Sequence, residues 1–250
     1  MAFEKFKLKY SAKRFMKDVI IIPTYNEREN IAQIISEIFE LLPEIFILVV
    51  DDNSPDGTAN FVKDLQKKFP NLSLLLRNKK EGLGRAYIDA FEKTLKDKNV
   101  KKIVTMDADF SYNPKYLTEM LKTADSFDVV IGSRYIKGGK TEGRELWRRI
   151  LSRGANLYCR FVIRLPIFDF TAGFNVINTA FLRKIDFSKI DISGYVFLIE
   201  LKCLLWKEGA SFKEIPILFK NRRDGESKMS SHVINEGILA PWKILFKKNK

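Results

Sequence analysis

Two aspartates separated by a single alanine, Asp107 and Asp109, follow an apolar run that ends at Met106. Residues two apart in an extended segment face the same side, so the two carboxylates would lie close together. Their charges repel each other unless one carboxylate is protonated or a cation lies between them. A divalent cation with oxygen ligands is the first candidate. The alternative is a helix start, because acidic residues are frequent in the first helical turn.

A second acidic pair, Asp51 and Asp52, ends another apolar run and leads into the turn sequence NSPDGT. A carboxylate there can accept hydrogen bonds from a base edge or a ribose hydroxyl, or it can cap a helix that begins at Asp56. Tyr25 offers a flat face for a base. With a metal ion on Asp107 and Asp109, this arrangement suits a nucleoside diphosphate.

The composition narrows the class of protein. The chain has 250 residues, of which 46% are hydrophobic, and can bury a sizeable core. Cys159 and Cys203 lie in apolar segments without metal-ligand spacing, which indicates buried thiols in a reducing compartment. No uncharged apolar run of about 18 residues occurs, so we expect no transmembrane helix. The basic segment 1–17 lacks the apolar core of a signal peptide and is expected to stay in the mature chain.

The net charge is +13, and much of it is concentrated in one block that only Glu142 and Glu145 oppose. Such a block indicates an anionic partner: nucleic acid, phosphate groups or an acidic membrane surface. Its basic residues are Arg134, Lys137, Lys140, Arg144, Arg148, Arg149, Arg153, Arg160 and Arg164.

Short branched apolar runs alternate with amphipathic segments along the first half, which predicts an α/β fold with a mostly parallel sheet and helices on both faces. The predicted strands are residues 18–23, 46–52, 72–77, 101–107 and 128–133, and the predicted helices are residues 27–42, 56–69, 83–96 and 114–122. Ligands of such sheets bind at the carboxyl ends of the strands, where the polar clusters would meet. EGLGRAY lacks the third glycine of a dinucleotide fingerprint and no P-loop sequence occurs, which disfavours a dehydrogenase or a P-loop ATPase.

We predict a single domain over residues 18–228, with a nucleotide-binding half at 18–133 and an acceptor-binding half at 134–228, followed by an amphipathic C-terminal segment at 229–250. Within the second half, residues 143–165 carry apolar side chains at helical spacing and a stripe formed by Arg149, Arg153, Arg160 and Arg164. This pattern is typical of a helix in a membrane interface, or of a helix packed on the core with a solvated basic face. Trp242, Leu245 and Phe246 beside Lys243 give the tail the same two alternatives. The apolar positions of the helix are Leu146, Trp147, Ile150, Leu151, Leu157, Tyr158, Phe161 and Val162.

The order of several motifs resembles that of the dolichol-phosphate mannose synthases, which are inverting family 2 glycosyltransferases with the GT-A fold. The resemblance runs from about residue 19 to residue 228. The broad motifs are IIPTYNERENI, VVDDNSPDGT and MDADFSYNP, and the more specific ones are RGAN, DFTAGF and RRDGESK.

The resemblance implies the residues of the site. The catalytic group would be Asp107, Asp109, Arg134 and Arg222, and the metal ligands would be Asp107, Asp109 and Ser111. Ser111 stands where several relatives carry a metal-binding glutamine, so Mg²⁺ and Mn²⁺ are both open. The nucleotide sugar would be bound by Pro23, Tyr25, Glu27, Val50, Asp52, Asp107, Ala108, Asp109, Arg134, Arg222 and Lys228.

The implied reaction transfers mannose from GDP-mannose to dolichyl or another polyprenyl phosphate with inversion. It gives dolichyl β-D-mannosyl phosphate, a lipid-linked mannose donor for glycosylation, and GDP. The protein would act peripherally on the cytoplasmic face of a membrane, with a small membrane subunit as a candidate partner. Rival hypotheses are a polyprenyl-phosphate glucosyltransferase and a transferase to a hydroxyl with Glu200 as base. A nucleic-acid-binding module would leave the carboxylate pairs unexplained, so no nucleic acid partner is expected.

Overall fold

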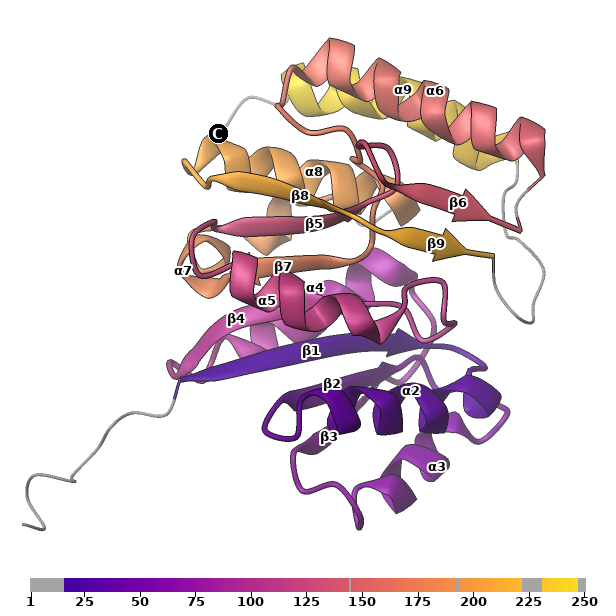
Figure 1. Cartoon of the computed structure of the whole chain (residues 1–250), viewed down its shortest axis with the longest axis vertical. Helices are drawn as coiled ribbons and strands as arrows, with labels where there is room; N and C mark the ends of the chain where they lie inside the picture. Colours follow the sequence, from indigo (N-terminus) through magenta and orange to yellow (C-terminus); the bar gives the residue numbers. More distant parts are fainter. Residues whose placement is uncertain (1–15, 144, 192–193, 222–230, 247–250) are drawn as a thin grey trace, which may run out of the picture.

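The computed structural model describes residues 16–143, 145–191, 194–221 and 231–246. Within these residues a seven-stranded sheet has the order β3-β2-β1-β4-β7-β5-β8, and a two-stranded sheet pairs β6 with β9 (Figure 1). The strands are β1 Lys17–Thr24, β2 Phe46–Asp51, β3 Leu72–Leu76, β4 Val100–Thr105, β5 Val129–Ser133, β6 Lys140–Glu142, β7 Asn175–Asn178, β8 Phe212–Pro216 and β9 Leu218–Lys220.

The sheet is mostly parallel, as predicted, with one exception. β7 lies between β4 and β5 and runs antiparallel to both, with Val176 paired to Val104 on one side and to Val130 on the other. The segment that precedes β7 therefore lies at the carboxyl ends of β4 and β5. A parallel strand would have placed that segment at the opposite edge of the sheet.

Helices cover both faces of the sheet, which confirms the predicted layers. Along β1, Ile20 and Ile22 belong to one apolar cluster, whereas Val19 and Ile21 belong to the other, because successive side chains of a strand face opposite sides. The first cluster includes α2 Arg28–Leu41, α3 Thr58–Leu65 and α5 Leu117–Thr123. The second includes α4 Leu83–Thr94, α6 Leu146–Ile163, α7 Thr179–Leu182, α8 Gly194–Lys207 and α9 Ser231–Phe246.

The predicted elements of the first half are present, with bounds shifted by a few residues. The helix predicted from residue 56 begins at Thr58, because Gly57 adopts a φ of 84° and the Asp56 carboxylate accepts the Thr58 amide. The helix predicted from residue 114 begins with a 3-10 turn, Pro114–Tyr116, which the Asn113 side chain caps.

Helices α6 and α9 lie side by side at the top of Figure 1. The predicted tail helix packs on the domain through Ala240 and Ile244, while Trp242 and Phe246 stay exposed. The tail therefore packs on the domain, and the membrane-interface alternative stays a prediction for the exposed face of α9. No helix among the described residues is both long enough and apolar enough to cross a membrane.

The connection between β5 and β6 comes unusually close to the backbone at the end of β5. A Cβ atom at Gly139 would lie 2.7 Å from the Ser133 carbonyl oxygen and 2.7 Å from the Arg134 carbonyl carbon. We expect Gly139→Ala to lower the free energy of unfolding by about 1–3 kcal/mol, because backbone atoms must move to admit the methyl group.

Gly154 on α6 provides the matched control, since nothing lies within 4 Å of a Cβ atom built there. Gly154→Ala should raise the stability by about 0.5–1 kcal/mol, because alanine favours the helix. Chemical denaturation of both variants measures the two effects. Equal shifts in the same direction would contradict the close approach at Gly139.

Candidate active site

Polar residues gather at the carboxyl ends of β1, β2, β4 and β5, which we call the polar edge. Sharp turns follow three of these strands: Asn26, Asn53 and Phe110 have φ values of 61°, 56° and 58°. The left-handed region is uncommon for residues other than glycine and is often found at functional sites. These turns fold the acidic motifs back onto the polar edge.

The carboxylates of Asp107 and Asp109 follow β4 at this edge and do not begin a helix, since the next helical turn starts at Pro114. Asp109 is 3% exposed and accepts the Ser111 amide at 3.0 Å. The Ser111 hydroxyl is buried and has no hydrogen-bond partner among the described residues. A Cβ atom at Gly173 would lie 3.5 Å from Asp107 Oδ2, so the glycine keeps space open beside that carboxylate.

This set of oxygen atoms fits a divalent cation of the Mg²⁺ or Mn²⁺ type, because hard ions prefer carboxylate, hydroxyl and water ligands. No cluster of three or more histidine, cysteine, aspartate or glutamate side chains in the described ranges could hold a metal ion by itself. Asp107, Asp109 and Ser111 would therefore hold the ion together with oxygen atoms from a substrate or water.

The two aspartates at the end of β2 have different partners. Asp51 is fully buried and holds the turn, accepting the Ser54 amide at 2.9 Å and the Thr24 hydroxyl at 2.9 Å. Asp52 Oδ1 instead pairs with the Arg77 guanidinium, while Oδ2 has no partner among the residues described. Burial raises the pKa of Asp52, and Arg77 partly counteracts that rise. Asp52 does not cap the following helix, so that alternative is wrong.

The nucleotide-binding residues expected on β1 lie beside this carboxylate. Pro23 pairs in register with the buried Val50 of β2, and the half-buried Tyr25 follows β1. The ammonium of Lys80 lies 3.6 Å from the Tyr25 ring centroid and so covers one face of the ring. A base stacked on Tyr25 would use the other face. Glu27 is half-buried at the start of α2, and its carboxylate accepts the Asn30 side-chain amide at 3.1 Å.

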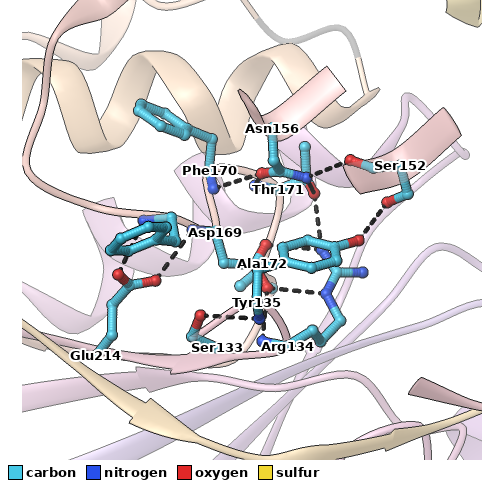
Figure 2. A network of polar contacts seen from close by, with 12 residues as sticks. Ser133, Arg134, Tyr135, Ser152, Asn156, Asp169, Phe170, Thr171, Ala172 and Glu214 are labelled. Atoms are coloured by element: carbon cyan, nitrogen blue, oxygen red, sulfur yellow. Dashed lines mark hydrogen bonds and ion pairs between the residues drawn. The ribbon is translucent and has the colours of Figure 1, made fainter. Parts of the chain in front are cut away.

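Arg134 follows β5 and is held by a carboxylate from the segment before β7 (Figure 2). Asp169 Oδ2 accepts the backbone amide of Arg134 at 3.0 Å and its Nε at 2.8 Å, while Oδ1 accepts Nη2 at 2.7 Å. Nη2 also donates to the Thr171 hydroxyl at 2.7 Å. Burial alone would raise the pKa of Asp169, but the Arg134 charge and hydrogen bonds outweigh it and lower that pKa.

The segment at residues 168–173, which we call the β7 entry loop, is held by hydrogen bonds to side chains of α6, α8 and β8. Asn156 of α6 accepts the Phe170 amide at 2.7 Å, and Lys202 of α8 donates to the Phe170 and Ala172 carbonyls at 3.0 and 2.9 Å. Burial lowers the pKa of Lys202 to about 8. The Glu214 carboxylate of β8 accepts the amides of Phe168 and Asp169 (Figure 2).

A cavity of about 490 Å³ opens between the β5–β6 connection and α6. Its cationic wall is formed by Arg134, Lys140, Arg149 and Arg153, and Leu146 and Ile150 add apolar surface. A phosphate group attached to a hydrocarbon chain matches this combination of charge and apolar surface. Arg149 and Arg153, which were predicted to bind a membrane surface, line this cavity.

The structure brings together most of the predicted site, with Arg222 and Lys228 lying outside the described residues. Sequence reasoning missed Arg77, Lys80, Asn156 and Asp169. Arg77 ends a predicted strand, and Asn156 and Asp169 lie within the RGAN and DFTAGF motifs, so a signal was present. The residues that they contact could not be inferred from the sequence, because the contacting residues lie far apart along the chain.

The comparisons identify the fold as that of the GT-A type of glycosyltransferase. The family profile described as Glycosyl transferase family 2 matches residues 19–186. The chain belongs to glycosyltransferase family 2, which confirms the enzyme class implied by the resemblance.

Two curated relatives match over most of both chains. The chain is 40% identical to the polyprenol monophosphomannose synthase of Mycolicibacterium smegmatis, over 91% of this chain and 87% of the relative. It is 37% identical to the undecaprenyl-phosphate mannosyltransferase of Micrococcus luteus, over 90% of this chain and 92% of the relative.

Solved structures share the fold at low sequence identity. A mannosyltransferase from Pyrobaculum calidifontis, solved with GDP-Man and Mn²⁺, superposes with a TM-score of 0.62 at 16% identity, covering 100% of this chain and 71% of that one. Glucosyl-3-phosphoglycerate synthase from Mycobacterium tuberculosis, solved with Mn²⁺, UDP and phosphoglyceric acid, gives 0.68 at 13% identity, covering 94% and 80%. Both confirm the GT-A fold.

Replacing Asp109 tests the metal site. We expect Asp109→Asn to keep the contact with the Ser111 amide and the melting temperature, because an asparagine oxygen still accepts. Loss of the carboxylate charge should weaken Mn²⁺ binding at least about tenfold, measured by calorimetry with GDP present, and should abolish turnover. Unchanged Mn²⁺ affinity in a folded variant would refute the assignment.

Proposed function

We propose that this enzyme transfers mannose from GDP-mannose to a polyprenyl phosphate with inversion at the anomeric carbon. The observation that carries the proposal is the basic and apolar cavity beside the polar edge. The printed names of the two curated relatives, a polyprenol monophosphomannose synthase and an undecaprenyl-phosphate mannosyltransferase, support this sugar and this acceptor class.

The donor binds at the first half of the polar edge. Asp52 Oδ2 accepts hydrogen bonds from the base or ribose, and the Tyr25 ring stacks on the base with the face opposite Lys80. Pro23, Glu27, Val50 and Ala108 complete the walls. Asp107, Asp109 and Ser111 would hold Mg²⁺ or Mn²⁺, and the ion would supply neutralising charge at the leaving diphosphate. Arg222 and Lys228, which lie outside the described residues, are proposed to bind the phosphates.

The acceptor phosphate enters the cavity beside Arg134. Its attacking oxygen is already anionic, so the reaction needs no general base, and cationic groups that gather two phosphorylated substrates are the main requirement. Attack from the side opposite the leaving diphosphate converts an α-linked donor to a β-linked product. Glu200, considered as a base for a hydroxyl acceptor, is 3% exposed and accepts the Asp191 amide at 2.8 Å, which supports a structural role instead.

The outer face of α6 supports a membrane-bound location for this reaction. Leu146, Trp147, Ile150, Leu157 and Phe161 are 53–80% exposed, although large apolar side chains are normally buried. Arg149, Arg153 and Arg164 are exposed beside them, and Arg160 lies 3.7 Å over the Phe168 ring. Exposed apolar residues of α9 extend this surface, which we call the lipid face: Leu239, Trp242, Leu245 and Phe246.

A basic amphipathic helix of this kind lies in the interface of an anionic membrane. Leu151 and Tyr158, counted above with the apolar positions, are half-buried, and Val162 packs in the core. We propose peripheral binding to the cytoplasmic leaflet, where a polyprenyl phosphate presents its head group. A small membrane subunit would find its contact surface here.

A panel of nucleotide sugars and polyprenyl phosphates tests the reaction. With GDP-mannose, a divalent ion and a polyprenyl phosphate, we expect labelled mannose in the lipid extract and release of GDP. Chelation of the ion should stop the transfer, because the diphosphate leaving group would lack its countercharge. Faster transfer from UDP-glucose would overturn the mannose assignment while leaving the fold intact.

The lipid face is tested by Leu157→Ser/Phe161→Ser, because these exposed residues do not line the cavity. Binding to vesicles that contain anionic lipid should weaken at least about tenfold in sedimentation, since two large apolar side chains no longer insert. Turnover of a soluble short-chain acceptor should be unchanged.

The matched control is Leu41→Ser/Leu76→Ser, which removes two exposed leucines, 45% and 47% accessible, outside the lipid face. Its vesicle binding should equal that of the unmodified protein. Equal vesicle binding by both variants would contradict the lipid face. Strong retention of the protein by random DNA and none by vesicles would favour the nucleic-acid alternative.

A further inference from the structure

Arg134 differs from the other cations of the cavity because its charge is already neutralised. The Asp169 carboxylate accepts hydrogen bonds from the Arg134 backbone amide, Nε and Nη2 at 2.7–3.0 Å. Nη2 donates a second hydrogen bond to the Thr171 hydroxyl. Nη1 makes no hydrogen bond to any residue in the described part of the chain, and in Figure 2 it points away from Asp169. Since Arg134 lines the cavity, Nη1 is the nitrogen left for a ligand.

Asp169 is fully buried, and among the described residues each hydrogen bond that its carboxylate accepts comes from Arg134. A buried ion pair of this kind adds little net stability, because desolvation of both charges offsets their attraction. Its hydrogen bonds do fix the direction of the guanidinium. The rings of Tyr135 and Phe219 lie 5.0 and 5.3 Å from its central carbon and limit its movement further.

We propose that Asp169 is a positioning residue for the transfer: it holds Arg134 in a fixed orientation, so that Nη1 meets a substrate phosphate as a directed donor. This inference rests on the proposed function of the same site. Lys140, Arg149 and Arg153 supply the attractive charge at the cavity, and Arg134 supplies direction. A donor fixed in advance does not have to reorganise during the reaction, whereas a misplacement of about 1 Å can reduce the rate about 100-fold.

The β7 entry loop, which contains Asp169, also contacts α6 and the residues that follow β4. Asn156 Oδ1 accepts the Phe170 amide at 2.7 Å, and its Nδ2 donates to the Thr171 hydroxyl at 3.2 Å. Four residues after Asp169, Gly173 lies against the Asp107 carboxylate and donates its amide to the Tyr112 hydroxyl at 3.0 Å. Asp169 therefore sets Arg134 relative to the proposed metal ligands.

Chemical rescue separates positioning from a merely structural role. Arg134→Ala removes the atoms of an ethylguanidinium ion and leaves the Asp169 carboxylate facing the space. Ethylguanidinium at millimolar concentration should raise the melting temperature of this variant and restore its turnover at least about tenfold. Ethylammonium, which has the same charge without the planar fork, should do neither.

The double variant Arg134→Ala/Asp169→Asn should show no response to ethylguanidinium, because the anionic partner is absent. It removes both charges, so it avoids the isolated buried cation that Asp169→Asn alone would create. An equal melting-temperature rise in the single and double variants would overturn the proposal. This measurement needs no substrate, whereas absence of mannose transfer by the unmodified enzyme would contradict the proposed function alone.

Steady-state kinetics provides a second readout. Asp169→Asn should lower kcat about 10- to 100-fold with little change in KM for the donor, because the lost term is the orientation of one donor. The control Asp125→Asn removes the acidic partner of another buried cation, Lys102, at 2.7 Å, and should leave kcat unchanged. Normal turnover by folded Asp169→Asn would also overturn the proposal.

Discussion

Strand β7 is antiparallel to its neighbours β4 and β5, and this direction brings the β7 entry loop to the polar edge. In a wholly parallel sheet, the residues before each strand lie at the opposite edge from the ligand. Here five consecutive residues of the loop, 169–173, bring Asp169 into contact with Arg134 and Gly173 beside Asp107. The side chains of the second half of the chain are therefore positioned relative to those of the first half by the backbone of one short antiparallel strand.

The two halves of the site use arginine in the same way. Arg77 is 6% exposed and bonds to Asp52, with Glu81 at 3.0 Å and Asp89 at 2.8 Å. Arg134 is likewise buried and bonds to Asp169 at 2.7 Å. The Arg77 guanidinium thus orients the Asp52 carboxylate, and the Arg134 guanidinium is itself oriented by Asp169. Arg149 and Arg153, by contrast, are exposed on α6 and line the cavity, where their charge can meet anionic substrates and lipid.

The strands of the first half and the acidic motifs at their ends were predictable, because apolar runs that stop at paired carboxylates have few other structural explanations. The direction of β7 was not predictable, since a four-residue strand whose first three residues are all buried is compatible with either orientation. Nor could the partner of Arg134 be inferred: Asp169 is 35 residues away, and only the antiparallel strand brings the two together. For Asp52, the sequence suggested nucleotide binding, with a helix cap as the alternative, but it did not reveal that Arg77, directly after β3, forms its ion pair.

Helix α6 serves both the cavity and the lipid face. Leu146 and Ile150 line the cavity and are also 69% and 63% exposed, so the cavity wall continues directly into the outer apolar surface. A polyprenyl chain could keep its hydrocarbon in the membrane while its phosphate reaches Arg149, Arg153 and Arg134, so the chain need not be extracted from the bilayer. The inner face of the same helix holds the β7 entry loop through Asn156. Seating α6 in a membrane would therefore orient the acceptor relative to the donor, because one rigid helix carries both sets of contacts.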